Sequence, residues 1–593
     1  MNWRNTIISV TLAGSLLFTV SSCASKPVSS EVAEGNNAVV KSVDNSEAAK
    51  GQIENKVSDD IHIDQVGYKA LSEKIAVVKG QYKQFQVVDS KTGLVVLTGK
   101  LTDSVKDTSS GDTVCQADFT NLTTPGKYFI SISGLGKSYD FLINDKVYLQ
   151  IGDAMLKALY YQRCGIALTS NFAGEYSHGI CHKDPAKFYG DETREIDVSG
   201  GWHDAGDYGK YVVPASVTAA DLLLSYEFYP QSFTDSTKIP ESGNKIPDIL
   251  DEAKYGITWL LKMQDSVSGG VYHKVTSRGF TEMTTMPDKD VDEQLVMPIS
   301  TTATGDFAAV TAMAARIYST IDPDFAQNCL QASQKAWDWL EKNKDFVGFK
   351  NPQDVTSGEY GDSLGNDERV WAAAELFRTT GDVKYSDYFV KNFEAGGLGL
   401  GWQNVSGFAA ISYMFSDKPD TDQGKVEDIK KAWLDKADMF VSTGEKDGYL
   451  VAMHEMEYNW GSNMNVATHA MHLLVADKLK SDDKYKQAAE NCAHYLIGRN
   501  TLNQSYVTGF GSKQVKQPYH RPSAADLAVL PVPGLMVGGP DSALEDDVVK
   551  SRMSGESPAK CYVDDVNSYS TNEVATYWNS SAIFIMGYLN SNR

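Results

Sequence analysis

The spacing of apolar residues changes near residue 145, and no other feature of the sequence constrains the fold as strongly. From about 60 to 144, short β-branched and aromatic segments alternate with Gly, Pro, Asp and Ser. Beyond 145, apolar residues recur at helical spacing in roughly twelve segments. We therefore predict a multidomain chain with a small all-β sandwich at 58–144 and a mainly helical domain at 145–593.

The first residues have the pattern of an export signal. Arg4 precedes an apolar run that is too short for a comfortable membrane span and that stops at "SSC". "VSSC" resembles the lipobox of bacterial lipoproteins, so we predict a lipoprotein signal peptide at 1–22 and a lipid anchor at Cys23. The alternative is an ordinary signal peptide and a secreted or periplasmic protein. Residues 23–57 have the composition of a flexible tether.

The overall charge argues against two kinds of partner. A net charge of -22 and a pI near 4.9 would repel nucleic acid and an anionic membrane surface, but not a neutral substrate. Seven cysteines in 593 residues do not form a dense disulfide framework. We expect a monomer in the cell envelope that acts on a neutral substrate.

Two stretches carry acidic residues in unusual surroundings. "GGWHDAGDYGKY" at 200–211 places Asp204 and Asp207 three apart among glycines and aromatics, as a loop that binds a cation, caps a helix or activates water. Glu573 lies in "STNEVATYW", where it could complete a capping box with Ser570 or stay protonated beside aromatic rings as a general acid. A proton donor and a separate base are what inverting glycoside hydrolysis requires.

These motifs resemble glycoside hydrolase family 9, also called cellulase family E. "GGWHDAGDYGKY", "YLIGRN", "SYVTGFGSK", "HRPS" and "YVDDVNSYSTNEVATYWNSS" carry the likeness, and "IHIDQVGYKA" looks like the immunoglobulin-like module found at the N-terminus of many members. The resemblance implies an (α/α)6 barrel and single-displacement hydrolysis of β-1,4-glucans. By motif, Asp207 would be the general base, Asp204 its partner in holding water, and Glu573 the general acid.

One motif departs from the family pattern. The family usually shows Pro, His, any residue and Arg, whereas this chain has Tyr519 before His520 and Arg521. Either His520 takes over the contact of that histidine with substrate, or Tyr519 substitutes as a hydroxyl donor. We expect the substrate to be bound by Tyr519, His520, Arg521, Tyr569 and Trp202.

Two metal sites are expected. Cys164, Cys181, His182 and His203 form a closed ligand set that suits structural zinc, and the resemblance supports it; the alternative is a disulfide between Cys164 and Cys181. The acidic loop at 357–369 offers oxygen ligands for calcium, which the family often holds there, or it simply caps the next helix at Asp367. The predicted calcium ligands are Asp362, Asp367 and Glu368.

Several functions remain open on the sequence alone. The main prediction is an endo-acting β-1,4-glucanase. An exo-acting cellodextrinase or β-glucosidase, a mixed-linkage or xyloglucan preference, and an inactive surface glucan-binding protein are the alternatives. We expect no carbohydrate-binding module after the helical domain, because none is visible in the sequence. We therefore expect soluble chains or oligosaccharides as substrates rather than crystalline cellulose.

Overall fold

The computed structural model describes residues 53–526 and 529–591. The predicted signal peptide, the predicted lipidation site at Cys23 and the tether up to residue 52 lie outside the described residues. Among the described helices, none has the length and apolar character needed to cross a membrane.

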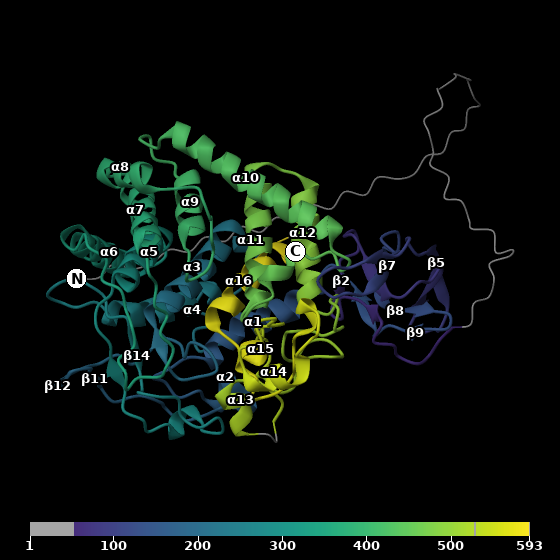
Figure 1. Cartoon of the computed structure of the whole chain (residues 1–593). Helices are drawn as coiled ribbons and strands as arrows, with labels where there is room; N and C mark the ends of the chain where they lie inside the picture. Colours follow the sequence, from purple (N-terminus) through teal and green to yellow (C-terminus); the bar gives the residue numbers. More distant parts are fainter. Residues whose placement is uncertain (1–52, 527–528, 592–593) are drawn as a thin grey trace, which may run out of the picture. The chain divides into compact units, whose positions relative to one another are not determined.

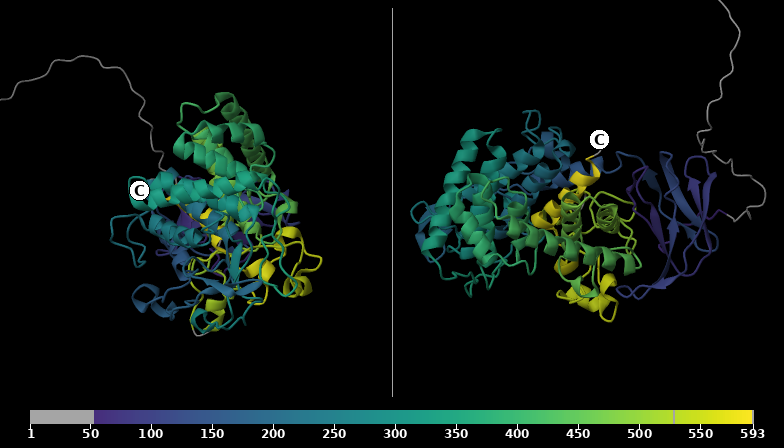
Figure 2. Two further views of the ribbon diagram at one scale, coloured as in Figure 1. Left: turned by 90° about the vertical axis from the view of Figure 1, so that its left-hand side faces the viewer. Right: turned by 90° about the horizontal axis from the view of Figure 1, so that it is seen from above.

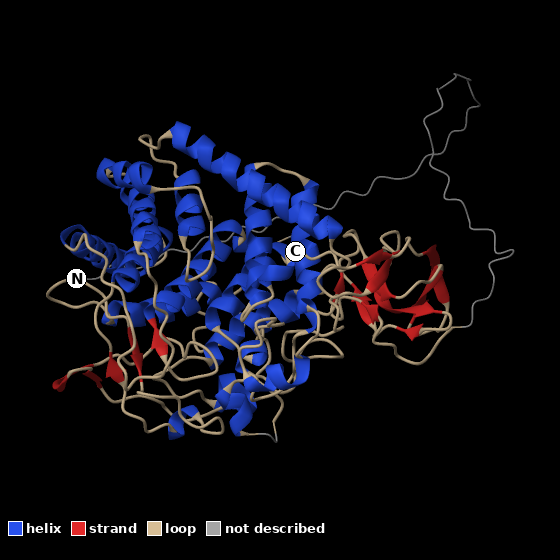
Figure 3. Cartoon of the chain, in the orientation of Figure 1, coloured by secondary structure: helices blue, strands red, loops and turns tan. Residues whose placement is uncertain are grey.

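The first domain is a β-sandwich, as the sequence predicted for 58–144 (Figure 3). One sheet has the strand order β1-β3-β7-β6, and the other has the order β2-β10-β8-β4-β5, with β9 paired to β8. Alternate residues of the two sheets form a shared core around Val78, Phe85 and Ile130. The strands are β1 (Ile61–His62), β2 (Gly67–Tyr68), β3 (Ile75–Lys79), β4 (Gln84–Asp89), β5 (Val95–Lys100), β6 (Val105–Lys106), β7 (Thr113–Asp118), β8 (Gly126–Ile132), β9 (Gly136–Lys137) and β10 (Phe141–Ile143).

The sandwich begins slightly earlier than the predicted boundary. The Glu54 backbone N–H donates to Ser131 Oγ at 2.9 Å, and the Lys137 N–H donates to the Lys56 carbonyl at 2.8 Å. The last residues of the predicted tether are therefore attached to the β8–β9 side of the sandwich.

The second domain is helical (Figures 1 and 2). Within the described residues, twelve helices have nine or more residues, which agrees with the predicted number. They are α1 (Leu149–Tyr161), α3 (Val212–Phe228), α4 (Asp248–Lys262), α5 (Thr301–Tyr318), α6 (Pro323–Lys342), α7 (Asn366–Thr380), α8 (Val383–Asn392), α9 (Ser406–Met414), α10 (Gln423–Lys446), α11 (Ser462–Leu479), α12 (Asp483–Leu496) and α16 (Thr576–Leu589).

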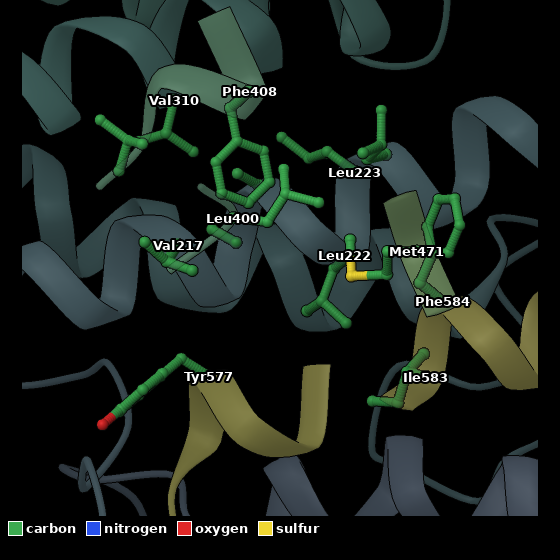
Figure 4. Packing of buried hydrophobic residues seen from close by; sticks show 14 of the residues in the cluster. Val217, Leu222, Leu223, Val310, Leu400, Phe408, Met471, Tyr577, Ile583 and Phe584 are labelled. Carbon is green, nitrogen blue, oxygen red and sulfur yellow. The ribbon is translucent and has the colours of Figure 1, made fainter. Parts of the chain in front are cut away.

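These helices alternate along the chain between two kinds. The helices α3, α5, α9 and α16 are buried around nearly their whole circumference, and α7 and α11 are buried over most of it. Their neighbours α4, α6, α8, α10 and α12 bury one face and expose the other, as amphipathic helices do. Figure 4 shows the apolar side chains packed between the buried helices, among them Leu222, Val310, Phe408 and Phe584.

A third sheet inside the helical domain was not predicted. Its strand order is β12-β11-β15-β14-β13, and its elements are only two to six residues long. They are β11 (Ala186–Phe188), β12 (Asp191–Ile196), β13 (Lys210–Tyr211), β14 (Lys274–Thr276) and β15 (Leu295–Val296). Short helices in the connections are α2 (Ser170–Ala173), α13 (Arg521–Ala525), α14 (Asp547–Met553) and α15 (Tyr569–Asn572).

A buried carboxylate joins the two domains. Asp64, from the turn after β1, is fully buried and accepts hydrogen bonds from the Tyr148 hydroxyl at 3.0 Å and from the backbone N–H groups of Val66 and Gly67 at 2.8 Å. Its other contact is His494 Nδ1 of α12, at 2.8 Å. The sandwich therefore has a specific, fully hydrogen-bonded attachment to the helical domain.

Candidate active site

The segment 200–209 is held by buried contacts at both ends. Trp202 is buried, and its indole N–H donates to Glu252 Oε1 of α4 at 2.7 Å. The His203 N–H donates to the carbonyl of Gln162 at 2.7 Å, and the Asp204 N–H donates to that of Gly209 at 3.0 Å. The backbone that carries Asp204 and Asp207 is thus fixed against α1 and α4.

Gly206 lets this segment dock closely on a second one, 519–521. A Cβ atom at Gly206 would collide with the carbonyl oxygen of Tyr519, so a larger residue would force the two segments apart. The Arg521 guanidinium donates through Nη1 to the Gly206 carbonyl at 2.8 Å and through Nε to the Thr281 carbonyl at 3.0 Å. Arg521 therefore positions the aspartate segment from the opposite side.

The two aspartates are buried and differ in their partners. The Tyr360 hydroxyl donates to Asp204 Oδ2 at 2.5 Å, while Asp204 Oδ1 has no hydrogen-bond partner. Asp207 Oδ2 accepts from the Tyr211 hydroxyl at 2.9 Å and from the Gly209 N–H at 3.1 Å. Burial and the nearby charge of Asp207 raise the pKa of Asp204 well above its usual range. Burial also raises the pKa of Asp207, but the charge of Arg521 and the two hydrogen bonds oppose that rise.

Glu573 follows α15 and belongs to the same group of carboxyls. Its backbone forms a bridge with Tyr519, and its carbonyl accepts from the Gly538 N–H at 2.8 Å. Burial and the charges of Asp207 and Asp204 raise the pKa of Glu573 well above its usual range. The Thr576 N–H donates to the Asp204 carbonyl at 2.8 Å, which links the two acidic motifs directly.

Burial and the neighbouring charges favour the protonated form of Glu573, whereas two hydrogen bonds and the charge of Arg521 favour the ionised form of Asp207. A protonated carboxyl can donate a proton, and an ionised one can accept a proton from water. The three carboxyls predicted from the sequence, Asp204, Asp207 and Glu573, are thus brought together.

Two of the predicted substrate-binding residues, Trp202 and His520, are buried in the protein interior. The Trp202 ring packs against Gly256 in the core, and only 2% of its surface is exposed. His520 is 1% exposed, and both of its ring nitrogens have partners: Nε2 contacts Gln162 at 2.9 Å, and Nδ1 contacts Ser523 at 2.8 Å. These two assignments are corrected to structural positions, because the rings already have protein partners on all polar atoms.

The other predicted residues lie beside Glu573. Tyr519 and Tyr569 are half-buried, with their ring centroids 6.3 Å apart, and the Tyr569 hydroxyl donates to the Glu545 carbonyl at 2.9 Å. Arg521 is buried, with its guanidinium carbon 5.7 Å from the centre of the Tyr519 ring. Tyr519 thus occupies the place where the family usually has histidine, with the histidine next to it turned into the protein.

Several aromatic residues near the carboxyls were missed by the sequence analysis. Trp460 is 42% exposed and lies 5.1 Å from the Tyr569 ring. Trp402 is half-buried and lies 5.0 Å from the ring of Tyr360, which holds Asp204. A cavity of about 200 Å³ opens beside Trp402, lined by residues that include Lys436, Asn465 and His469. Trp460 lies in the loop just before α11. A tryptophan in a loop was the only feature of the sequence that could have indicated a place for it near the substrate.

The predicted zinc ligands converge. The ligand atoms of Cys164, Cys181, His182 and His203 all lie within 4.8 Å of one another. Among the described residues, no other group of three or more His, Cys, Asp or Glu side chains is as compact. Cys164 Sγ lies 3.5 Å from His182 Nδ1, and Cys181 Sγ lies 3.8 Å from His203 Nε2. The two cysteines are not bridged. His182 Nε2 also contacts Asp290 Oδ2 at 3.1 Å, as the second nitrogen of a metal-bound histidine commonly does.

The predicted calcium ligands do not form such a compact group. Asp367 Oδ2 accepts from the Val405 N–H at 2.9 Å, and Asp362 Oδ1 accepts from the backbone N–H groups of Ser363 and Leu364. The structure adds Asp306 of α5, which the sequence analysis did not name. Both carboxyl oxygens of Asp306 and one oxygen of Glu368 are buried without partners. Burial and the neighbouring acidic charges raise the pKa of both groups.

Comparison with known proteins identifies both domains. Residues 148–586 match the family model described as glycosyl hydrolase family 9, and residues 56–137 match the model described as cellulase N-terminal ig-like domain. Among curated proteins, a cellodextrinase of Butyrivibrio fibrisolvens is 36% identical over 544 residues, which cover 88% of this chain and 98% of that protein. Endoglucanase D of Acetivibrio thermocellus is 36% identical over 545 residues, with coverage of 90% and 84%.

Solved structures agree over the same length. The structure of AaCel9A in complex with cellobiose-like isofagomine superposes with a TM-score of 0.85 at 35% identity, covering 89% of this chain and 99% of that one. A Zn-binding triple mutant of the endoglucanase J30 superposes with a TM-score of 0.84 at 34% identity, covering 88% of this chain and all of that one.

Proposed function

Because the chain belongs to glycosyl hydrolase family 9, we propose that it cleaves internal β-1,4-glucosidic bonds with inversion, using Glu573 as general acid and Asp207 as general base. The chain is a glycoside hydrolase of the cellulase type. The alternation of buried and one-sided helices supports an (α/α)6 barrel as the frame of the site. The observation that carries the proposal is the grouping of three buried carboxyls whose charges act on one another.

In the proposed reaction, Glu573 protonates the glycosidic oxygen as the bond to the anomeric carbon breaks. Asp207 removes a proton from the water that attacks the opposite face of the sugar, and Asp204 helps to hold that water. The hydrogen bond from Tyr360 fixes Asp204 Oδ2, which leaves the unpartnered Oδ1 for the water. We infer that Tyr519, Tyr569, Trp460 and Trp402 offer ring faces to the sugars.

The products of cellohexaose, with their anomeric form followed over time, test this proposal. Inversion releases the α-anomer first, and an endo-acting enzyme gives cellobiose, cellotriose and cellotetraose early. Release of glucose or cellobiose from one end only would instead favour the cellodextrinase alternative, which the relative from Butyrivibrio supports. An initial β-anomer would contradict the assigned roles. Absence of hydrolysis would favour the inactive binding protein, which has no need of all three carboxyls.

We also propose that zinc binds at Cys164, Cys181, His182 and His203. Two thiolates and two imidazoles complete a tetrahedral shell, so the metal would have a structural role and would take no part in the reaction. Burial raises the pKa of Cys164, but the hydrogen bond from Cys181 and the charges of Lys210 and His203 outweigh it and lower that pKa well below its usual range. The same hydrogen bond raises the pKa of Cys181, so Cys164 is the sulfur of the pair that ionises more readily, as suits a zinc ligand.

Calcium is proposed at Asp362, Asp367 and Glu368, together with Asp306. Buried carboxyl oxygens of Asp306 and Glu368 that have no hydrogen-bond partner support this proposal. A calcium ion bound to them would balance their negative charge. Asp367 and Glu368 belong to the first turn of α7, close to the segment that carries Tyr360, so calcium would stabilise that side of the site. We further propose that the chain acts as a monomer held at the cell envelope by a lipid on Cys23.

A further inference from the structure

The two hydrogen bonds that Asp207 accepts both end on one oxygen, Oδ2. The donors are the Tyr211 hydroxyl at 2.9 Å and the Gly209 N–H at 3.1 Å. Only 7% of Asp207 is exposed, and the nearest arginine, Arg521, gives its own hydrogen bonds to backbone carbonyls. The two neutral donors therefore act together with the charge of Arg521 to favour the ionised form of Asp207, and both donate to Oδ2.

The direction of the Tyr211 hydroxyl is fixed by a second contact. The Gly358 N–H donates to the Tyr211 oxygen at 3.1 Å, so the single proton of that hydroxyl is free for Asp207. A Cβ atom at Gly358 would lie 3.1 Å from the Tyr211 oxygen and crowd this contact. Burial and the charges of Asp207 and Asp204 raise the pKa of Tyr211 well above its usual range, so the phenol remains a donor.

Lys274 holds the segment that carries Gly358. It is fully buried on β14, where it pairs in register with Tyr211 on β13. Its ammonium donates to the Gly358 carbonyl at 2.6 Å, to Asn351 Oδ1 at 2.8 Å and to Ser357 Oγ at 3.1 Å. All three of its protons thus point to the segment 351–358.

We propose that Tyr211 and Lys274 are positioning residues for the general base: Lys274 clamps 357–358, Gly358 orients the Tyr211 hydroxyl, and Tyr211 holds Asp207 ionised and turned for proton transfer. This inference rests on the proposed role of Asp207. The charged and titratable groups that face Asp207 are His203, Asp204 and Tyr211 on its own segment, Lys274 on β14, Tyr519 and Arg521 on the docked segment, and Glu573 after α15.

The test is the dependence of kcat/KM on pH for a soluble cello-oligosaccharide. In Tyr211→Phe the carboxylate loses a donor, its pKa rises, and the acidic limb of the profile moves to higher pH by about one unit. Lys274→Met moves the limb in the same direction, through Tyr211 and through the loss of its own charge near Asp207, so the shift in the double variant Y211F/K274M is smaller than the sum of the two single shifts. Tyr208→Phe is the matched control, because Tyr208 is equally buried but donates to the Thr285 carbonyl. Its acidic limb stays that of the wild type.

An acidic limb in Y211F that coincides with the wild type overturns the role of Tyr211. Shifts of Y211F and K274M that simply add overturn the relay from Lys274 through Tyr211. Should K274M not fold, Ser357→Ala removes one partner of the clamp and takes its place in the same comparison. Asp207→Asn distinguishes the proposed role of Asp207 from the positioning role of Tyr211 and Lys274. Near wild-type activity of D207N contradicts Asp207 as the base. An inactive D207N, together with an acidic limb that does not move in Y211F, contradicts only the positioning role.

Discussion

At the residue scale, the proposed general acid is Glu573, whose pKa is raised by burial and by the charges of Asp207 and Asp204. Glu573→Gln keeps the shape of the side chain but cannot donate the proton, so we expect hydrolysis of cello-oligosaccharides to fall by about 10²- to 10⁴-fold. An aryl glycoside whose leaving group needs no protonation should recover part of the rate. Steady-state kinetics on both substrates check this, with Glu556→Gln, an exposed glutamate of the same segment, as control. Equal losses on both substrates would contradict the role of general acid.

The three carboxyls of the candidate site could be predicted because each lies in a compact motif. Asp204 and Asp207 are three apart, and Glu573 lies among aromatics that are its neighbours in sequence. Tyr360 could not be predicted, because its contact with Asp204 joins residues 156 positions apart. His520 was placed at the substrate because it is next to the position of the family's usual histidine, and Trp202 because it lies in the motif of the aspartates. Their burial depends on Glu252 and Gln162, which sequence spacing does not bring near them.

At the element scale, long helices could be predicted and short strands could not. A helix such as α6 repeats its apolar pattern over 20 residues and begins at a capping aspartate, Asp322, followed by proline. By contrast, β13 has two residues, and its identity as a strand depends on pairing with β14, more than 60 positions away. The whole inference about Tyr211 and Lys274 depends on that pairing, so it required the structure.

The proposed zinc would join the end of α1 to the loop before the catalytic aspartates. Chelation, or Cys181→Ser, should lower the thermal midpoint by on the order of 5 °C or more and reduce the rate, because a loosened His203 displaces Asp204 and Asp207. Cys329→Ser is the control, since Cys329 is equally buried but lies outside the group. Elemental analysis should find one zinc per chain. Fully active, metal-free protein with Cys164 and Cys181 bridged would refute the site.

At the scale of the whole molecule, we expect the β-sandwich to stabilise the helical domain through Asp64, which contacts Tyr148 and His494. Asp64→Ala would leave the buried N–H groups of Val66 and Gly67 without an acceptor and would remove the partner of His494 Nδ1, at a cost on the order of 3 kcal/mol or more. Thermal unfolding should show a clearly lower midpoint for D64A. Asp118→Ala removes an exposed carboxylate of the same domain and should change it little. An unchanged midpoint in D64A would mean that the attachment contributes no stability.

The proposed anchor determines where the whole enzyme works. "VSSC" and the polar segment behind it support lipidation at Cys23, and a lipid followed by a tether would keep the catalytic domain at the envelope while it reaches soluble glucans. In cells that process lipoproteins, the wild-type protein should partition with membranes, and Cys23→Ser should release it or block its processing. Fractionation with mass analysis of the mature N-terminus measures both effects. Wild-type protein that is wholly soluble, with an unmodified N-terminus, would rule out the anchor and favour a secreted or periplasmic enzyme.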